Sequence, residues 1–396
     1  MKKSGSGRRG RWAVRACAAG AAVAAAAGAG GAAMAATTTA SVQVTTPVAC
    51  LASALASAIS SAPANAILVL KPGCTYRIPA SLPEVTSDLT IVGDGDTITP
   101  ANDDDFTALE VSGAELTISR LTFRGFFTGT DTEPGALIND GGSVTITSSR
   151  FTDNTGGDDG GAILNKAGAT LDISSTEFQG NVSGIDDDCD AVRADCGSDG
   201  YGGAISNESG SEATLTADNF LDNHATEDGG AIYIGGGMVT VRGTGSSAGE
   251  AVDFTDNTAG GDYGGAIDNA DGSLVVSYAA FSHNSSPDYG GAIENDGGSA
   301  SVSGSSFSHN HSEYGGAIET DFFPLNLTGD MLTGNSAYDG GAIIMYSNTT
   351  LNKTIVTGNH ATSHGGGIYL SGGTASITNG SFVTGNTPDN CYGFSC

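Results

Sequence analysis

The sequence predicts an all-β protein, a right-handed parallel β-helix of about nine coils with a short helical cap at its N-terminal end. Two recurring phrases carry this prediction. The first phrase, "GGAI" or the variant "GGGI", begins at Gly160, Gly202, Gly229, Gly264, Gly290, Gly315, Gly340 and Gly365. The second phrase is an apolar residue three positions before an asparagine, and it alternates with the first. Self-similar units of this length are typical of solenoids, in which each coil buries its apolar side chains against the next.

The second phrase sets the expected number of coils. It occurs nine times, as Phe151/Asn154, Phe178/Asn181, Phe220/Asn223, Phe254/Asn257, Phe281/Asn284, Phe307/Asn310, Leu332/Asn335, Val356/Asn359 and Val383/Asn386. Short alternating runs such as "SVTITSS" and "ATLDIS" lie between the phrases and end at Gly, Asn or Asp. Such runs indicate strands of a few residues joined by turns. The right-handed sense is the usual one for parallel crossovers.

Residues 1–35 are predicted to be a secretory signal peptide. A basic start, "MKKSGSGRRGRWAVR", precedes a weakly apolar stretch of Ala and Gly and a small-x-small site at residues 33–35. No later segment reaches the run of about 20 apolar residues that a spanning helix needs. We therefore expect a secreted, extracellular bacterial protein without a membrane span, with cell-surface association as a further expectation.

The rest of the chain divides into a cap, a β-helix and a short end. Residues 36–84 are expected to form the cap and an entry strand, because "CLASALASAIS" places Leu51, Leu55 and Ile59 at helical spacing. Residues 85–390 are expected to form the β-helix, and residues 182–201 an inserted loop within it. Residues 391–396 are expected to be an end tied by a disulfide.

Six cysteines follow the predicted signal peptide. An even number of cysteines in an exported chain suggests disulfides, although the sequence alone leaves the pairing open. Clustering favours three local pairs, which are Cys50–Cys74, Cys189–Cys196 and Cys391–Cys396. A metal–thiolate site is the weaker interpretation, because the spacings match no zinc signature.

The charge of the chain excludes several classes of partner. The sequence has 15 basic and 44 acidic residues, and six of the basic residues lie in the first 35 positions. The remaining chain therefore carries 9 basic against 44 acidic residues. Such a field repels nucleic acid and anionic lipid surfaces. We expect a monomer whose partner is a glycan or another component of a cell surface or matrix.

The alternation of the two phrases resembles the repeats of chlamydial polymorphic outer membrane proteins and of related pectate-lyase-like β-helix proteins. The resemblance covers about residues 120–390. In that family the repeats form a surface-exposed passenger linked to adhesion. The resemblance therefore implies a parallel β-helix and a role in adhesion, and it implies little about chemistry.

Every position of a repeat becomes a vertical column in a solenoid. If Ile293 points inward, Ala292 and Glu294 point outward. The Glu294 column reads Asp268, Glu294 and Glu319 on successive coils. A second acidic column reads Asp262, Asp288 and Glu313, and beside it stand Tyr263, Tyr289 and Tyr314. Carboxylates on adjacent coils, roughly 5 Å apart, cannot all ionise easily, so some pKa values should rise or a cation should bind.

Three hypotheses fit these columns. The leading one is a non-catalytic glycan-binding or adhesive face, supported by Ca²⁺, in which tyrosines contact sugar. The alternative is a polysaccharide-degrading enzyme, either a hydrolase that uses paired carboxyls from Asp268, Glu294, Glu319, Asp288 and Glu313 or a Ca²⁺-dependent lyase. The third is a solvated acidic face that keeps the protein soluble. The scarcity of basic residues argues against a lyase, whose best place would be near Arg150, Lys166 and the loop 182–201.

Two further patterns concern asparagine and aspartate. The asparagines of the second phrase are expected to form an internal amide ladder, with Asn165, Asn207, Asn269 and Asn295 forming a second, partial one. "DDDCDAVRADCGSD" begins like a calcium loop at Asp186, Asp188 and Asp190, but it lacks the glycine and glutamate of an EF-hand. A looser Ca²⁺ site and a plain acidic loop both remain open there.

Overall fold

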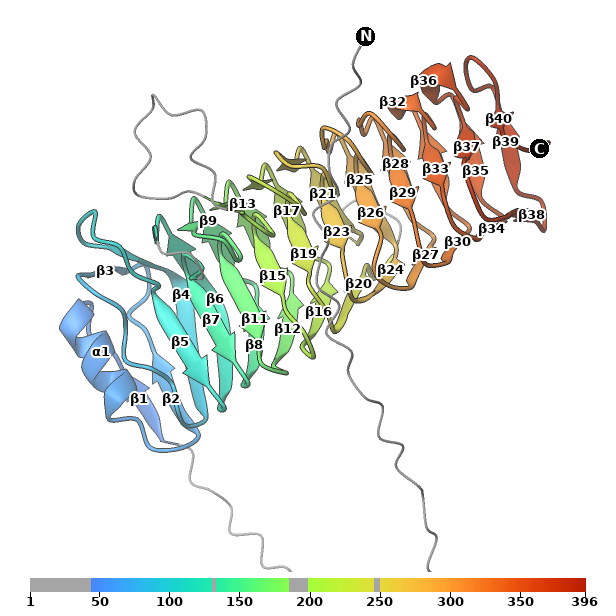
Figure 1. Ribbon diagram of the computed structural model, residues 1–396. Helices are drawn as coiled ribbons and strands as arrows, with labels where there is room; N and C mark the ends of the chain where they lie inside the picture. Colours follow the sequence, from blue (N-terminus) through green and yellow to red (C-terminus); the bar gives the residue numbers. More distant parts are fainter. Residues whose placement is uncertain (1–43, 130–132, 185–198, 246–249) are drawn as a thin grey trace, which may run out of the picture. The chain divides into compact units, whose positions relative to one another are not determined.

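A computed structural model describes residues 44–129, 133–184, 199–245 and 250–396 of the protein. This part of the chain is a parallel β-solenoid of about 13 coils with one helix (Figure 1). The predicted fold class is confirmed, and the predicted number of nine coils is too low. The predicted signal peptide lies outside the described residues.

One sheet, sheet A, supplies two strands to most coils. Its first column of strands runs along the whole stack with parallel pairing. The column comprises β1 (Thr45–Pro47), β2 (Ala66–Val69), β4 (Leu89–Pro100), β6 (Glu115–Arg124), β8 (Ser143–Thr147), β12 (Thr170–Ser174), β16 (Glu212–Thr216), β20 (Met238–Arg242), β24 (Ser273–Ser277), β27 (Ala300–Ser303), β30 (Leu325–Thr328), β34 (Thr349–Asn352) and β38 (Ala375–Thr378).

The second column of sheet A begins with β3 and continues through the later halves of the long strands β4 and β6. It comprises β3 (Thr75–Ile78), β9 (Arg150–Thr152), β13 (Glu177–Gln179), β17 (Asn219–Leu221), β21 (Val252–Thr255), β25 (Ala279–Ser282), β28 (Ser306–Ser308), β31 (Met331–Thr333), β35 (Ile355–Thr357) and β39 (Phe382–Thr384).

A second sheet, sheet B, carries the "GGAI" strands, and short strands form a further four-stranded sheet and a two-stranded sheet. Sheet B comprises β5 (Leu109–Ser112), β7 (Leu137–Asp140), β11 (Ile163–Lys166), β15 (Ile205–Asn207), β19 (Ile232–Ile234), β23 (Ile267–Asn269), β26 (Ile293–Asn295), β29 (Ile318–Thr320), β33 (Ile343–Met345), β37 (Ile368–Leu370) and β40 (Cys391–Tyr392). The short strands are β10 (Thr155–Gly156), β14 (Val182–Ser183), β18 (His224–Ala225), β22 (Thr258–Ala259), β32 (Ser336–Asp339) and β36 (His360–His364).

The additional coils lie at the N-terminal end, where the recurring phrases are absent. The strands β1, β2 and β3 belong to sheet A, although residues 36–84 were expected to form only a cap and an entry strand. The ring of Phe123 stacks on Phe151, but Phe126 stands where the phrase would have an asparagine. Counting complete phrases therefore misses coils that pack with the same geometry.

The predicted helical cap is α1 (Ala52–Ser60), which lies beside the first strands (Figure 1). Leu55 and Ile59 are buried as expected. The predicted packing of Leu51 is wrong, because this residue is the extended N-cap of the helix and is 62% exposed. A disulfide between Cys50 and Cys74 links the start of the helix to the residue before β3.

The apolar column of the second phrase forms a continuous aromatic stack inside the solenoid. Successive ring centroids lie 4.7–5.1 Å apart, and the ring planes are nearly parallel. The stack comprises Phe123, Phe151, Phe178, Phe220, Phe254, Phe281 and Phe307. These rings are fully buried, so the stack contributes both apolar burial and regular coil spacing.

The asparagines of the second phrase form the predicted internal ladder. Asn284 is representative: its Oδ1 accepts hydrogen bonds from the backbone N and the Nδ2 of Asn257, at 3.0 and 2.9 Å. Its Nδ2 donates to the carbonyl of Phe254 and to Oδ1 of Asn310, both at 3.0 Å. The same pattern runs from Asn154 to Asn386.

The second, partial ladder is also present in sheet B. Asn165 Nδ2 donates to Asn207 Oδ1 at 2.8 Å, and Asn269 Nδ2 donates to Asn295 Oδ1 at 2.6 Å. Ile234 interrupts the series between these two pairs. The first ladder is continuous, whereas the second leaves the buried Oδ1 of Asn269 without a hydrogen bond among the described residues.

The two glycines of "GGAI" meet different steric requirements. Gly290 has φ +58°, and a Cβ there would overlap the carbonyl oxygen of Ile293, because the chain folds back onto the strand that follows. A Cβ at Gly291 would overlap the carbonyl of Gly316 in the next coil. The first glycine therefore permits the fold-back, and the second permits close stacking of coils.

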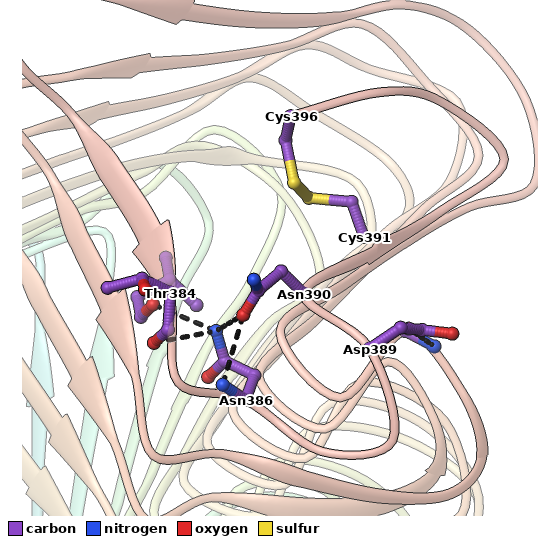
Figure 2. Close-up of a disulfide and its surroundings, with 8 residues drawn as sticks. Thr384, Asn386, Asp389, Asn390, Cys391 and Cys396 are labelled. Carbon is purple, nitrogen blue, oxygen red and sulfur yellow. Dashed lines mark hydrogen bonds between the residues drawn. A yellow bond between two sulfur atoms is a disulfide. The ribbon is translucent and has the colours of Figure 1, made fainter.

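The last coil ends the asparagine ladder with a residue outside the repeat. The backbone N and the Nδ2 of Asn386 donate to Oδ1 of Asn390, at 3.0 and 3.3 Å (Figure 2). Asn390 directly precedes the disulfide between Cys391 and Cys396. The Cys50–Cys74 and Cys391–Cys396 pairs are thus those that the clustering predicts, while Cys189 and Cys196 lie outside the described residues.

The predicted inserted loop, residues 182–201, begins within the stack. Val182 and Ser183 form β14, which pairs with β10 and β18. Tyr201 lies directly before the Gly-Gly pair of its coil and bridges to Asp159 of the previous one. Residues 185–198, with most of the predicted loop, lie outside the described residues.

We predict that Asn284→Ala lowers the free energy of unfolding by about 3 kcal/mol or more, because each orphaned buried polar group costs roughly 1–3 kcal/mol. Urea denaturation followed by circular dichroism measures this loss. The matched control is Asn326→Ala on the exposed side of β30, which should change stability by less than about 0.5 kcal/mol. Equal effects of the two substitutions would contradict a stabilising ladder.

Candidate functional site

Three columns of side chains meet beside sheet B on three successive coils. The carboxyl column comprises Asp268, Glu294 and Glu319 on β23, β26 and β29. The tyrosine column comprises Tyr263, Tyr289 and Tyr314, which bridge one another in parallel. The outer acidic column comprises Asp262, Asp288 and Glu313, directly before the tyrosines. The sequence therefore predicted correctly which residues share a column.

The carboxyl column is not the exposed acidic face that strand alternation suggests. Asp268, Glu294 and Glu319 are only 1%, 1% and 3% exposed. The reason is the fold-back at the Gly-Gly pair, which lays the preceding segment against the strand; a Cβ at Gly264 would overlap the carbonyl of Ile267. Alternation gives the direction of a side chain, but it does not show that another segment covers that side of the sheet.

Burial makes the carboxyl column hold protons. The pKa of Glu294 is raised well above its usual value by burial first and by the neighbouring Asp268 second. Burial and then the charge of Asp321 also raise the pKa of Glu319. Interaction with the carboxyl of Asp268 raises the pKa of Glu294, whereas interaction with Glu294 lowers the pKa of Glu319, so Glu294 is the carboxyl favoured to keep its proton. We therefore infer that Glu294, which lies between Asp268 and Glu319, is the protonated carboxyl of the column.

The tyrosine column forms a half-buried ridge over these coils. The ring centroids of Tyr263 and Tyr289 are 5.5 Å apart, and those of Tyr289 and Tyr314 are 5.3 Å apart, in stacked arrangements. The pKa of Tyr263 is raised by burial, then by Asp262 and Glu294. Burial and Glu313 raise the pKa of Tyr314 to about 12. The phenols of Tyr263 and Tyr314 therefore stay protonated at physiological pH.

The outer acidic column is the accessible acidic part of the site. Asp262 and Glu313 are exposed, and Asp288 between them is half-buried. The pKa of Asp288 is raised by burial first, then by the charges of Asp262 and Glu313. These carboxyls are the ones that a ligand in solution can reach.

On other coils, tyrosines that the sequence analysis missed take the position of the carboxyl column. Tyr233 stands in register with Asp268, and its ring lies 4.6 Å from that of Tyr201. Tyr369 and Tyr392 stack at 5.1 Å on the last coils. The sequence could have predicted their position, because Tyr233 and Tyr369 each directly follow the isoleucine of "GGAI" or "GGGI".

The predicted calcium positions in the inserted loop are not tested by the structure. Asp186, Asp188 and Asp190 lie outside the described residues, so a Ca²⁺ site there stays a prediction. Within the part of the chain that the structure describes, no group of three or more His, Cys, Asp and Glu side chains is arranged to hold a metal ion. Calcium binding at the acidic columns therefore stays a prediction.

The two cations proposed for a lyase site lie on different sheets. Arg150 belongs to β9 of sheet A and pairs with Glu177 at 3.5 Å. Lys166 belongs to β11 of sheet B and pairs with Asp140 at 3.8 Å. Each is engaged by a carboxylate of a neighbouring coil, and the structure gives no contact that joins them.

Comparisons with known proteins agree with the repeat architecture. Residues 148–166, 219–235 and 353–371 match the Chlamydia polymorphic membrane protein repeat. Each matched segment holds one apolar-x-x-Asn phrase and one "GGAI" or "GGGI" phrase, or its start. The chain is thus a parallel β-helix with repeats of the polymorphic membrane protein type.

The solved structures include a similar one, the crystal structure of an alginate lyase from Paenibacillus sp. str. FPU-7. It is 11% identical with a TM-score of 0.37, and the match covers 84% of this chain and 98% of that chain. No curated protein matches the chain in sequence. Among the described residues, no helix has the length and apolar character that crossing a membrane requires.

We predict that Glu294→Gln becomes progressively more stable than the natural protein as the pH rises above about 4.5. A carboxyl with a raised folded-state pKa stabilises the fold while protonated, and this stabilisation is lost as the pH rises toward the folded-state pKa. The neutral amide escapes the loss, so its advantage grows by up to about 1.4 kcal/mol per pH unit. Urea unfolding at several pH values between 4.5 and 8 measures it.

The control for this prediction is Glu212→Gln, which removes an exposed carboxylate from β16. It should show no advantage that grows with pH. A constant or falling difference for Glu294→Gln would mean that the carboxyl column does not hold a proton.

Proposed function

We propose that the protein is a secreted, monomeric, non-catalytic surface or matrix protein that binds glycan along the tyrosine and outer acidic columns. The observation that carries the proposal is the ridge itself. Tyr263, Tyr289 and Tyr314 repeat at 5.5 and 5.3 Å on three coils, and accessible carboxylates stand beside them. Such a surface offers the same contacts several times along one line.

The chemistry of the ridge suits a hydroxyl-rich, uncharged ligand. The exposed carboxylates of Asp262 and Glu313 accept hydrogen bonds from sugar hydroxyls. Because the tyrosine rings cover one another's faces, a sugar would pack on their edges rather than on a flat aromatic platform. Contacts that recur at each coil, roughly every 4.8 Å, add together along an extended polysaccharide.

Burial argues against the enzyme alternative, a polysaccharide hydrolase or lyase. Asp268, Glu294 and Glu319 cannot touch a substrate without displacement of the segments that cover them. The hydrolase hypothesis therefore depends on Asp288 and Glu313. The raised pKa of Asp288 beside a second carboxyl is the property that a proton donor needs, and it keeps this alternative testable.

Secretion and surface exposure are part of the same proposal. The basic and weakly apolar start of the chain supports export. Two disulfides support an oxidising compartment. The repeats resemble those of surface-exposed passengers, which supports adhesion as the biological role.

We predict that a neutral polysaccharide retards the protein in affinity electrophoresis and that the double variant Asp288→Asn/Glu313→Gln weakens this binding by about tenfold or more. The expected tenfold loss of affinity corresponds to the loss of hydrogen bonds to charged groups. Tyr289→Ala should weaken binding as well. The matched control is Tyr278→Ala, which removes an exposed tyrosine from the turn between β24 and β25.

Cleavage is measured in the same samples as new reducing ends and as the ultraviolet absorbance of unsaturated uronates, with Ca²⁺ or a chelator present. We expect none. Cleavage that Asp288→Asn abolishes would replace the binding proposal with a hydrolase. Cleavage that requires Ca²⁺ and survives this substitution would replace it with a lyase at another site.

A further inference from the structure

An open groove of about 630 Å³ lies on sheet A, among the N-terminal coils. Strands β3, β4, β6, β9 and β13 form its floor through their second-column positions. Its lining includes Arg77, Arg124 and Arg150, together with five threonines and one glutamine. The groove belongs to a different sheet and different coils from the tyrosine column.

The groove gathers positive charge on an acidic protein. Only 9 basic residues follow position 35, and three of them line this one hollow. Two carboxylates, Asp153 and Glu177, share the lining, so the arginines outnumber the acids there. On a chain with a net charge of −29, this concentration of cations has no counterpart in the repeats that follow, where no Lys or Arg occurs between Arg242 and Lys353.

The arginines are held in place and still present donors to solvent. Arg124 Nε pairs with Asp153 Oδ2 at 3.2 Å, and a terminal nitrogen of Arg150 pairs with Glu177 Oε2 at 3.5 Å. The two arginine side chains are 63% and 62% exposed. Each of these pairs joins one nitrogen to one oxygen. The other N–H groups of each guanidinium fork can therefore engage a ligand.

The pairing register places Arg77 and Arg124 in one column and Arg150 in the neighbouring column. Arg77 on β3 pairs with Thr99 of β4, and Arg150 on β9 pairs with Thr122 of β6, in the stacking order β3, β4, β6 and β9. Arg124 lies on the same strand as Thr122. With about 4.8 Å per coil, Arg77 and Arg124 stand roughly 10 Å apart along the axis, and the five strands span about 19 Å. Such a length fits several units of an extended chain better than a single small anion.

We propose that this groove binds an acidic polysaccharide, with sugar carboxylates on Arg77, Arg124 and Arg150 and sugar hydroxyls on the row of threonines. The planar guanidinium matches a carboxylate with two parallel hydrogen bonds. Threonine hydroxyls both donate and accept, which suits the hydroxyls of a sugar. The acidic remainder of the surface repels a polyanion, so binding is confined to the groove.

Calorimetric titration with polygalacturonate oligomers tests this proposal on the whole protein. We expect binding, and we expect Arg77→Gln, Arg124→Gln and Arg150→Gln each to weaken it by about tenfold, the usual scale for losing a hydrogen bond between charged groups. Arg124→Lys keeps the charge but loses the fork, so it should recover only part of the affinity. Circular dichroism and thermal unfolding establish that each variant folds.

Matched ligands and variants define the outcomes. Fully methyl-esterified polygalacturonate has the same sugars without the charge and should not bind. Arg242→Gln removes an exposed arginine outside the groove and should leave affinity unchanged, as should Tyr278→Ala, which removes an exposed tyrosine outside both proposed surfaces. The proposal would be overturned if the methyl ester bound as tightly as polygalacturonate. It would also be overturned if Arg124→Gln and Arg150→Gln bound polygalacturonate as tightly as the natural protein does. Equal, arginine-dependent binding of dextran sulfate would overturn its preference for carboxylates.

Discussion

The buried asparagine ladder is the interaction on which the rest of this structure depends. Each amide accepts from the asparagine one coil before and donates to the asparagine one coil after, from Asn154 to Asn386. A coil cannot slip by one residue without leaving buried donors and acceptors unpaired. The phenylalanine stack beside the ladder keeps the same spacing, with ring centroids 4.7–5.1 Å apart. Together they hold coils of different length in one register.

Fixed register turns sequence positions into columns, and the columns decide where chemistry can occur. Where the repeat is regular, the Gly-Gly fold-back buries Glu294 and its neighbours and leaves a ridge of tyrosines with an accessible acidic edge. On sheet A of the N-terminal coils, the outward positions carry Arg77, Arg124 and threonines instead. The two proposed binding surfaces differ in charge, and they lie on different sheets and different coils of the solenoid. A hydroxyl-rich neutral glycan suits the first surface, and an acidic one suits the second.

The sequence predicts the repeated parts of this molecule well and the unrepeated parts poorly. The phrase around Asn284 predicts a coil, a buried amide and a strand at the right places, because one physical requirement recurs on every coil. Counting the phrases leaves out the first coils, since these coils pack with the same geometry under different residues. Strand alternation gives the direction of Glu294 but not the segment that covers it. The groove is invisible in the sequence because Arg77, Arg124 and Arg150 become neighbours only once the pairing register is known.

Native-state hydrogen exchange in Asn284→Ala, followed peptide by peptide, tests most directly whether the ladder holds the coils together. Nearest-neighbour coupling in a solenoid predicts faster exchange in the coils that carry Asn257, Asn284 and Asn310. The coils that carry Asn154 and Asn386 should exchange as in the natural protein. Unchanged exchange around residue 284, or the same increase in every coil, would contradict the account.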